Sequence, residues 1–234
     1  MQSLLQTTFC KRFGVESLAI YDFLSNHHSH FMTFLFDIGR VLLDFDFEGS
    51  LSRLFPNNTV NIAGRLERLH ERKDEFEAGK VDEQAFIAWA IKVLDIHATP
   101  SEFHRAWQDI FSLNVPMWQC VKKLADSGHR LILFSNTNSI HWPWMTEAFP
   151  EFAIFDGAVI SFETGSVKPD AAIYHHAILQ YDLIPEDTFY IDDLPNNIAK
   201  GRELGFRTWQ YDLHNHAAFE AWLTSEFVNC SASI

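Results

Sequence analysis

The sequence alternates between short apolar runs and amphipathic helical stretches, and this alternation limits the possible folds more than any other feature. The apolar runs have the length of buried strands and lie at Thr33–Phe36, Arg130–Phe134, Ala158–Ser161, Thr188–Ile191 and Arg207–Tyr211. Helical patterns lie between or after them, at Trp118–Ser127, Asp170–Gln180, Asn196–Leu204 and Ala217–Phe227. Strands that alternate with helices indicate βαβ units. We therefore predict an α/β fold with a parallel sheet covered by helices on both faces.

The alternation is interrupted once, after the first strand. From about Phe47 to Val115 we find no strand-like run, and the apolar residues follow a helical period at Val60–Ala78, Asp82–Leu94 and Ser101–Phe111. The last of these stretches begins with a helix-start signal, Thr99-Pro100-Ser101-Glu102. We expect a core domain made of residues 32–46 and 116–234, with a helical domain, residues 47–115, inserted into it.

Residues 1–31 precede the first expected strand, and we interpret them as an N-terminal extension. The segment lacks an apolar stretch followed by a small-residue cleavage site, so it does not resemble a secretion signal. It ends in His27-His28-Ser29-His30. Such a histidine cluster can bind a metal, but it is more often a solvated linker.

Charge and cysteine content argue against several classes of partner. The net charge of −13 disfavours binding to nucleic acid or to an anionic membrane. No apolar run reaches the roughly 18 residues that would span a bilayer. The cysteines, Cys10, Cys120 and Cys230, are widely spaced and form no CxxC pair, so neither a zinc site nor a disulfide framework is predicted. Reduced thiols and a cytoplasmic location are expected.

Polar residues lie at or just beyond the ends of four expected strands. Asp37 follows the first strand, Ser135-Asn136-Thr137-Asn138 the second, and Asp192-Asp193 the fourth, while Lys168-Pro169-Asp170 opens the helix after the third. Taken singly, each group has an ordinary explanation as a helix cap, a surface charge or a solvated turn. Ligands of open parallel sheets bind at the carboxyl ends of the strands. The four groups together therefore predict one binding site.

The four segments resemble, in order, the four motifs of the haloacid dehalogenase (HAD) superfamily. The resemblance extends from about Met32 to Tyr211, and the helical insertion resembles the C1 cap of that superfamily. The residues within the motifs are similar to those of the branch that contains bacterial α-glucose-1-phosphate phosphatase, and they also resemble the phosphatase domain of bifunctional epoxide hydrolases. The resemblance implies a HAD-like Rossmannoid core and a magnesium-dependent phosphatase. Its substrate would be a small phosphorylated metabolite such as a sugar phosphate.

The resemblance also implies roles for single residues. Asp37 would be the nucleophile that is transiently phosphorylated and a ligand of Mg²⁺, together with the carbonyl of Gly39 and the carboxylate of Asp193. Asp192 and Asn197 would not bind the metal directly but would contact its ligands or reach it through a water molecule. The side chain of Ser135, the amide of Asn136 and the ammonium of Lys168 would bind the phosphoryl oxygens. This chemistry needs a cation, because a carboxylate that attacks a phosphate dianion is repelled by it.

One position departs from the motif. Most phosphatases of the superfamily carry an aspartate two residues after the nucleophile, as general acid and base, whereas this chain has Gly39. The resembling branch also has glycine there, so the departure does not imply inactivity, but it leaves the proton donor open. Metal-bound water, the substrate or a residue of the helical insertion could serve. Asp44 and Asp46 are expected to fix the loop that follows.

Two other functions remain open from the sequence. A 2-haloacid dehalogenase would use the same aspartate to attack carbon. That reaction needs no metal, so the Asp192-Asp193 pair disfavours it. A non-catalytic protein with this fold, which binds a ligand or a partner, is supported only by Gly39.

Overall fold

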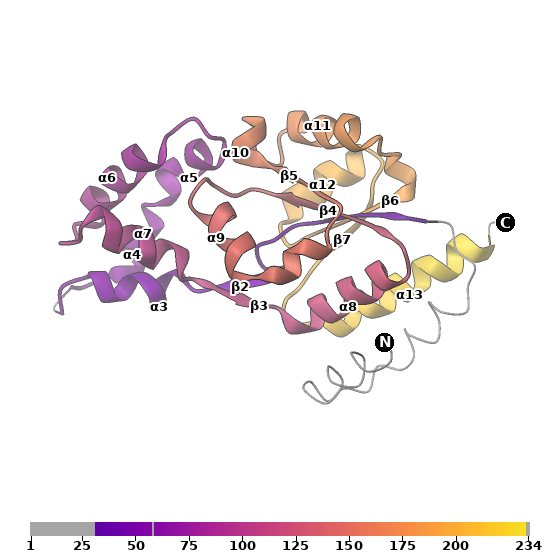
Figure 1. The fold of residues 1–234 in the computed structure, drawn as a ribbon, viewed down its shortest axis with the longest axis horizontal. Coiled ribbons are helices and arrows are strands. Elements are labelled where there is room, and N and C mark those ends of the chain that lie inside the picture. The colour runs from indigo at the N-terminus through magenta and orange to yellow at the C-terminus, as the bar shows by residue number, and fades with distance from the viewer. Residues whose placement is uncertain (1–30, 58, 233–234) are drawn as a thin grey trace. The chain divides into compact units, whose positions relative to one another are not determined.

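The computed structural model describes residues 31–57 and 59–232. Five parallel strands form the main sheet, in the order β5-β4-β1-β6-β7 (Figure 1). Their bounds are β1 Thr33–Phe36, β4 Arg130–Ser135, β5 Gly157–Ile160, β6 Thr188–Asp192 and β7 Arg207–Gln210. All five predicted strands are present, and the predicted α/β class is confirmed. The predicted N-terminal extension, with its histidine cluster, lies outside the described residues except for Phe31.

Six α-helices of the described residues precede, connect or follow these strands, and four of them match predicted helices, whereas the second and third in chain order were not predicted. The six helices are α8 Val115–Asp126, α9 His141–Ala148, α10 Ser161–Thr164, α11 Ala171–Tyr181, α12 Pro195–Glu203 and α13 His216–Ala232. One apolar core lies between the sheet and the helices α11 and α12, and it includes Phe134, Tyr174, Tyr190 and Ile198. In the described part of the chain, no helix is both long and apolar enough to cross a membrane.

Five α-helices and one short 3-10 helix, Ser52–Leu54, form an insert between β2 and β3 and are drawn in purple to magenta in Figure 1. The α-helices are α3 Phe47–Leu51, α4 Ile62–Glu67, α5 His70–Glu77, α6 Glu83–Leu94 and α7 Pro100–Gln108, and we call the whole segment the helical insert. The insert has its own apolar core, in which the rings of Phe76 and Phe86 stack with centroids 4.0 Å apart. The predicted start of α7 is confirmed, because Thr99 and Glu102 form a reciprocal capping box.

The structure corrects three expectations within this region. A strand, β3 Phe111–Leu113, lies where no strand was predicted, and it pairs antiparallel with β2 Leu43–Phe45. Three residues are too few to show a period of two in the sequence, so this strand is defined by its partner. The helix expected at Ser101–Phe111 ends earlier, at Gln108, because Phe111 belongs to strand β3. The helix expected at Val60–Ala78 is divided into α4 and α5 by a turn in which Leu69 N donates to Leu66 O.

Gly79, which follows α5, fixes the approach of the helical insert to the core. Its φ is +66°, and a Cβ atom placed on it would lie 2.4 Å from the carbonyl oxygen of Phe162 in α10. A real Cβ cannot approach backbone so closely, so only glycine fits both the left-handed conformation and the contact. The end of α5 is thereby held against α10, the helix that directly follows strand β5.

We predict that Gly79→Ala destabilises the protein more than Gly165→Ala does. Both glycines have a positive φ, but a Cβ on Gly165 (φ +75°) would meet nothing within 4 Å. Gly165→Ala should therefore cost only the left-handed penalty, about 1–2 kcal/mol, whereas Gly79→Ala must also displace the backbone of Phe162. Urea denaturation of the two variants measures the difference. Equal losses would contradict the close packing of α5 on α10.

Candidate active site

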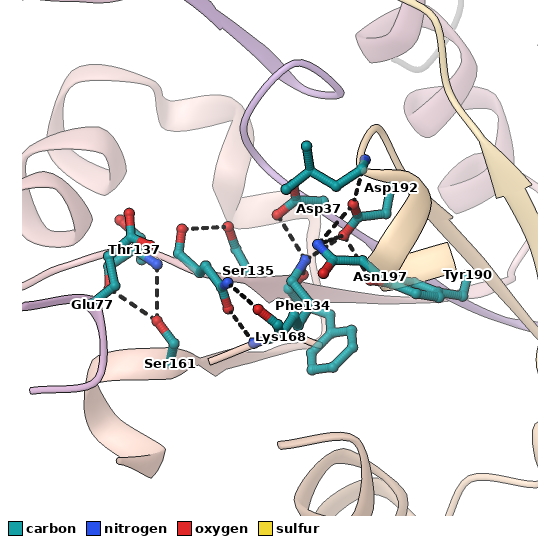
Figure 2. Close-up of polar contacts among 12 residues, drawn as sticks. Asp37, Glu77, Phe134, Ser135, Thr137, Ser161, Lys168, Tyr190, Asp192 and Asn197 are labelled. Carbon is teal, nitrogen blue, oxygen red and sulfur yellow. Dashed lines mark hydrogen bonds and ion pairs between the residues drawn. The ribbon is translucent and has the colours of Figure 1, made fainter. Parts of the chain in front are cut away.

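The candidate site lies at the carboxyl ends of β1, β4 and β6 (Figure 2). Asp37 directly follows β1, the central strand, and its backbone N–H donates to Ile191 O of β6 at 2.9 Å. Asp192 ends β6 and Ser135 ends β4. Because β1 pairs with both neighbours, the three side chains lie at adjacent positions along one edge of the sheet. The structure thus brings together the residues that the strand-end pattern predicted.

The ammonium group of Lys168 lies between two of the carboxylates. Lys168 Nζ is 3.1 Å from Asp37 Oδ1 and 2.6 Å from Asp192 Oδ2, and it donates to Phe134 O at 2.7 Å. Its side chain is almost completely buried. Burial lowers the pKa of Lys168, but the charges of Asp192 and Asp37 outweigh burial and hold the pKa above its usual value. Lys168 is therefore a permanent cation beside the nucleophile candidate.

Asn136 holds Lys168 in place through its side chain. Asn136 Nδ2 donates to Lys168 O at 2.9 Å, and Lys168 N donates to Asn136 Oδ1 at 2.8 Å. The side-chain amide thus pairs with both backbone groups of the lysine and joins the end of β4 to the segment before α11. Sequence reasoning assigned a role only to the backbone amide of Asn136. No sequence signal distinguishes such a clamp from an ordinary polar residue in a loop.

The carboxylate of Asp192 is fully buried and saturated with donors. Asp192 Oδ1 accepts from Leu194 N at 2.9 Å and from Asn197 Nδ2 at 3.0 Å. Asp192 Oδ2 accepts from Lys168 Nζ and from the hydroxyl of Tyr190, each at 2.6 Å. Four donors leave this carboxylate little capacity for another ligand. Asp192 and Asn197 thus form a scaffold that fixes Lys168 and the start of α12.

Asp193 differs from its neighbour because its carboxylate is only partly buried and receives no hydrogen bond from another residue in the described ranges. Burial, with the charges of Asp37 and Asp192, raises the pKa of Asp193 to about 7. Burial raises the pKa of Asp37 to about 6; Lys168 opposes this shift and Asp192 adds to it. Burial is therefore the main obstacle to ionisation of both aspartates.

The group of three aspartates offers a site for a hard divalent cation, with Asp37 and Asp193 as the carboxylates that are not saturated with donors. One oxygen of each carboxylate, from Asp37, Asp192 and Asp193, lies within 4.8 Å of the other two. Oxygen donors in such a group suit Mg²⁺. The three carboxylates carry more negative charge than Lys168 neutralises, and burial, the main cause of the raised pKa values of Asp37 and Asp193, adds to the cost of their ionisation. The residues present therefore fit a bound magnesium ion.

The loop after Asp37 is held by its own residues. A Cβ on Gly39 would lie 3.3 Å from the ring of Phe45, so a side chain at this position would crowd that ring. Arg40 has a φ of 57° and turns back on the loop: its guanidinium pairs with Asp44, donates to Phe45 O at 3.1 Å and lies over the Phe45 ring. Asp46 caps α3 by accepting from Gly49 N. The loop-fixing roles expected for Asp44 and Asp46 are thus confirmed.

Other polar residues of the predicted groups have structural partners. Asn138 Oδ1 accepts from the backbone N–H groups of Ile140 and His141 and so positions the start of α9. Thr137 N donates to Ser161 Oγ at 3.0 Å. Asp170 caps α11 by accepting from Ala172 N at 3.1 Å. For these positions the ordinary structural explanation describes the observed contacts.

The chain matches the family model described as haloacid dehalogenase-like hydrolase over residues 31–205, which is well over half of its length. The protein therefore belongs to this family of hydrolases, and the family predicted from the four motifs is confirmed. The more detailed likeness to the glucose-1-phosphate phosphatase branch stays a prediction.

The relatives are similar in sequence and fold. D-ribitol-5-phosphate phosphatase from Bacteroides thetaiotaomicron is 28% identical over 187 residues, which cover 75% of this chain and 89% of the relative. The HAD family enzyme BT-2542 of the same species, solved with magnesium and inorganic phosphate, has a TM-score of 0.65 at 23% identity, covering 79% of this chain and 96% of its own. A HAD-like hydrolase from Porphyromonas gingivalis has a TM-score of 0.65 at 24% identity, with coverages of 83% and 98%.

We predict that Asp193 makes a contribution to the stability of the metal-free protein that is lost as the pH rises from about 4 to 7. A carboxyl group whose pKa is raised by folding retains its proton longer in the folded state, so its contribution is present at low pH and lost as pH passes the folded value. His129 and His141, whose pKa values are lowered by burial to about 4 and about 3, act in the opposite sense below pH 6.5.

The difference between variants isolates the contribution of Asp193. Asp193→Asn should gain stability relative to the wild type as the pH is raised from 5 to 8 in the presence of a chelator. Urea denaturation at each pH measures this gap. A gap that stays constant over the range would show that folding does not raise the pKa of Asp193.

Proposed function

We propose that this protein is a magnesium-dependent phosphatase that hydrolyses small phosphate esters through an aspartyl-phosphate intermediate on Asp37. The observation that carries the proposal is the position of Asp37, whose carboxylate lies beside the buried ammonium of Lys168 and within a group of three aspartates. The likeness to a ribitol-phosphate phosphatase, and to a structure that contains magnesium and phosphate, supports the same reaction.

In the first half of the reaction, one oxygen of Asp37 attacks the phosphorus atom of the ester. A bond forms between Asp37 and phosphorus, and the bond from phosphorus to the leaving oxygen breaks. Lys168 stabilises the charge of the phosphoryl oxygens because its own charge is fixed by Asp192. Ser135 Oγ and the backbone N–H of Asn136 are the other proposed donors. Mg²⁺ would neutralise the negative charges of the carboxylates and the phosphoryl group and bring them together.

In the second half, water attacks phosphorus, releases inorganic phosphate and restores the carboxylate of Asp37. Gly39 supplies no acid at the position that most relatives use, and the ring of Phe45 crowds that position. The proton for the leaving oxygen therefore has to come from water, from the substrate or from another residue of the chain. Without a positioned acid, esters with good leaving groups, such as p-nitrophenyl phosphate, should be the most favourable test substrates.

We assign different tasks to the two adjacent aspartates. Asp193 is the proposed magnesium ligand, with Asp37 and the carbonyl of Gly39, because its carboxylate is not used by neighbouring donors. Asp192 is proposed to act indirectly, because Lys168, Tyr190, Asn197 and the Leu194 amide already occupy its oxygens.

The natural substrate is proposed to be a phosphorylated sugar or sugar alcohol. The relative that acts on D-ribitol 5-phosphate supports this class. The helical insert, within the proposed domain of residues 47–115, is proposed to act as a cap over the site. Residues 32–46 and 116–234 would form the catalytic core. Because the reacting groups lie at the strand ends, they would contact the phosphoryl group. The insert is proposed to contact the rest of the substrate.

We predict that the wild type hydrolyses p-nitrophenyl phosphate in the presence of Mg²⁺ and that EDTA abolishes the activity. Asp37→Asn keeps the shape of the side chain but removes the attacking charge, so it should retain less than about a tenth of wild-type turnover while remaining folded. Metal-independent release of halide from a 2-haloacid would instead support a dehalogenase. A folded protein with neither activity would support a binding role.

We predict that Asp193→Ala greatly raises the Mg²⁺ concentration required for half-maximal activity and has little effect on the free energy of unfolding. Asp192→Ala should do the reverse, because it leaves Lys168 and its other donors without their buried acceptor, at a cost of about 3–5 kcal/mol. Magnesium titrations and urea denaturation of both variants separate the two effects. Equal magnesium requirements in the two variants would contradict the assignment.

A further inference from the structure

A second charged pair, Lys73 and Glu77, lies one helical turn apart on α5 of the helical insert. Lys73 Nζ is 2.8 Å from Glu77 Oε2. The side chain of Glu77 is only 10% exposed, whereas that of Lys73 is 43% exposed. The same helix carries a comparable pair, Arg72 and Glu75, also 2.8 Å apart, whose carboxylate is 53% exposed. The two pairs differ in their surroundings, because Glu77 is buried and Glu75 is not.

The buried pair lies toward the candidate active site. Its helix, α5, is followed by Gly79, which lies against the backbone of Phe162 in α10. The residue before Phe162 is Ser161, whose hydroxyl is bonded to the backbone of Thr137 beyond β4. Figure 2 draws Glu77 at this Thr137 and Ser161 end of the site. These contacts link the end of α5 to the strand end that carries Ser135.

The charges of the pair and of the site also affect one another. Burial lowers the pKa of Lys73, but Glu77 and, to a smaller extent, Asp74 and Asp37 hold it above its usual value. Burial raises the pKa of Glu77, while Lys73 and, more weakly, Lys168 oppose the increase. Electrostatic interactions of this kind require proximity. The pair is therefore within the electrostatic reach of both the nucleophile candidate and its lysine.

The pair has unused hydrogen-bonding capacity. Among the described residues, Glu77 receives a hydrogen bond only from Lys73, through Oε2, so Oε1 is available as an acceptor. Lys73 donates only to Glu77, so two of its three N–H groups are available. An ion pair with one buried and one half-exposed partner also adds little to stability, because the cost of desolvating the buried Glu77 carboxylate offsets the attraction. Stability alone therefore gives little reason for a carboxylate at this position.

We propose that Lys73 and Glu77 form a specificity-determining pair that binds hydroxyl groups of the substrate, and that the preferred substrates are therefore polyhydroxylated monophosphates. A hydroxyl group both donates and accepts, so Glu77 Oε1 can accept from one hydroxyl while Lys73 donates to it or to its neighbour. The pair lies on the insert, away from the three aspartates, and so contacts the part of the substrate that does not react. This inference rests on the phosphatase function and the sugar or sugar-alcohol phosphate proposed above, and it assigns the residues that select that substrate.

The test compares a polyol phosphate with a substrate that lacks hydroxyl groups. Lys73→Met and Glu77→Met replace the pair by apolar chains of similar length, singly and together. For D-ribitol 5-phosphate, we expect kcat/KM of the double variant to fall roughly tenfold or more, mainly through KM, since two or more hydrogen bonds are lost. For p-nitrophenyl phosphate, kcat/KM should stay within about twofold of the wild type, because the reacting groups are unchanged.

Matched controls come from the same helix. Arg72→Met and Glu75→Met remove the exposed pair and should leave the ratio of the two kcat/KM values unchanged. Glu77→Gln keeps the shape of the side chain and can be used if the methionine variants do not fold; it should lower the same ratio to a smaller extent.

Three results would overturn the inference. Equal losses for both substrates would assign the pair to the chemistry or to the fold. Unchanged values for both would remove it from the site. A wild type that hydrolyses p-nitrophenyl phosphate but no polyol phosphate would reject the substrate class while leaving the phosphatase function intact. Failure of the function itself would appear differently, as a folded wild type that hydrolyses no phosphate ester with Mg²⁺ present.

Discussion

The ammonium group of Lys168 is the element on which the arrangement of the site depends. It lies 3.1 Å from Asp37 and 2.6 Å from Asp192, two carboxylates that end adjacent strands of the sheet. Without this cation, the parallel strands would bring buried negative charges together, at a large electrostatic cost. Lys168 is held in turn by the side chain of Asn136 and by Phe134 O, so that this one residue joins the end of β4 to the two carboxylates.

The single positive charge of Lys168 does not neutralise the three carboxylates of the site. The remaining negative charge is the basis for the proposed binding of a divalent cation. Asp37 and Asp193 both have raised pKa values in the metal-free protein, to about 6 and about 7, mainly because they are buried. A site of this kind favours a divalent cation, and the cation would then allow a phosphate dianion to approach. Asp192 and Asp193 are adjacent in sequence but differ in their partners. The difference separates a structural carboxylate from one that is available to a metal.

The fold and the central site residues could be predicted because they follow from local pattern and one topological rule. Apolar runs marked β1, β4, β5, β6 and β7, and the carboxyl ends of parallel strands share an edge. Asp37, Ser135 and Asp192 were therefore expected to be neighbours. Strand β3 could not be predicted, because three residues show no period and depend on pairing with β2. Helix α9 was missed because its aromatic residues, Trp142 and Trp144 among them, give no clear apolar face.

The tertiary contacts of the site were equally invisible in the sequence. The clamp between Asn136 and Lys168 joins residues 32 positions apart, and the approach of α5 to α10 depends on the contact between Gly79 and Phe162. Glu77 shows the same limit. In the sequence it belongs to a run of charges typical of a solvated helix face, yet the fold buries it, and only its surroundings distinguish it from Glu75.

The central claim is that Asp37 becomes phosphorylated during turnover. The most direct measurement is rapid acid quenching of the protein during hydrolysis of a phosphate ester, followed by peptide mass spectrometry to locate the phosphoryl group. The account predicts a transient phosphoryl group on the peptide that contains Asp37, formed in the presence of Mg²⁺ and absent from Asp37→Asn. Full turnover with no phosphoryl group on that peptide, or with the group on another residue, would contradict it.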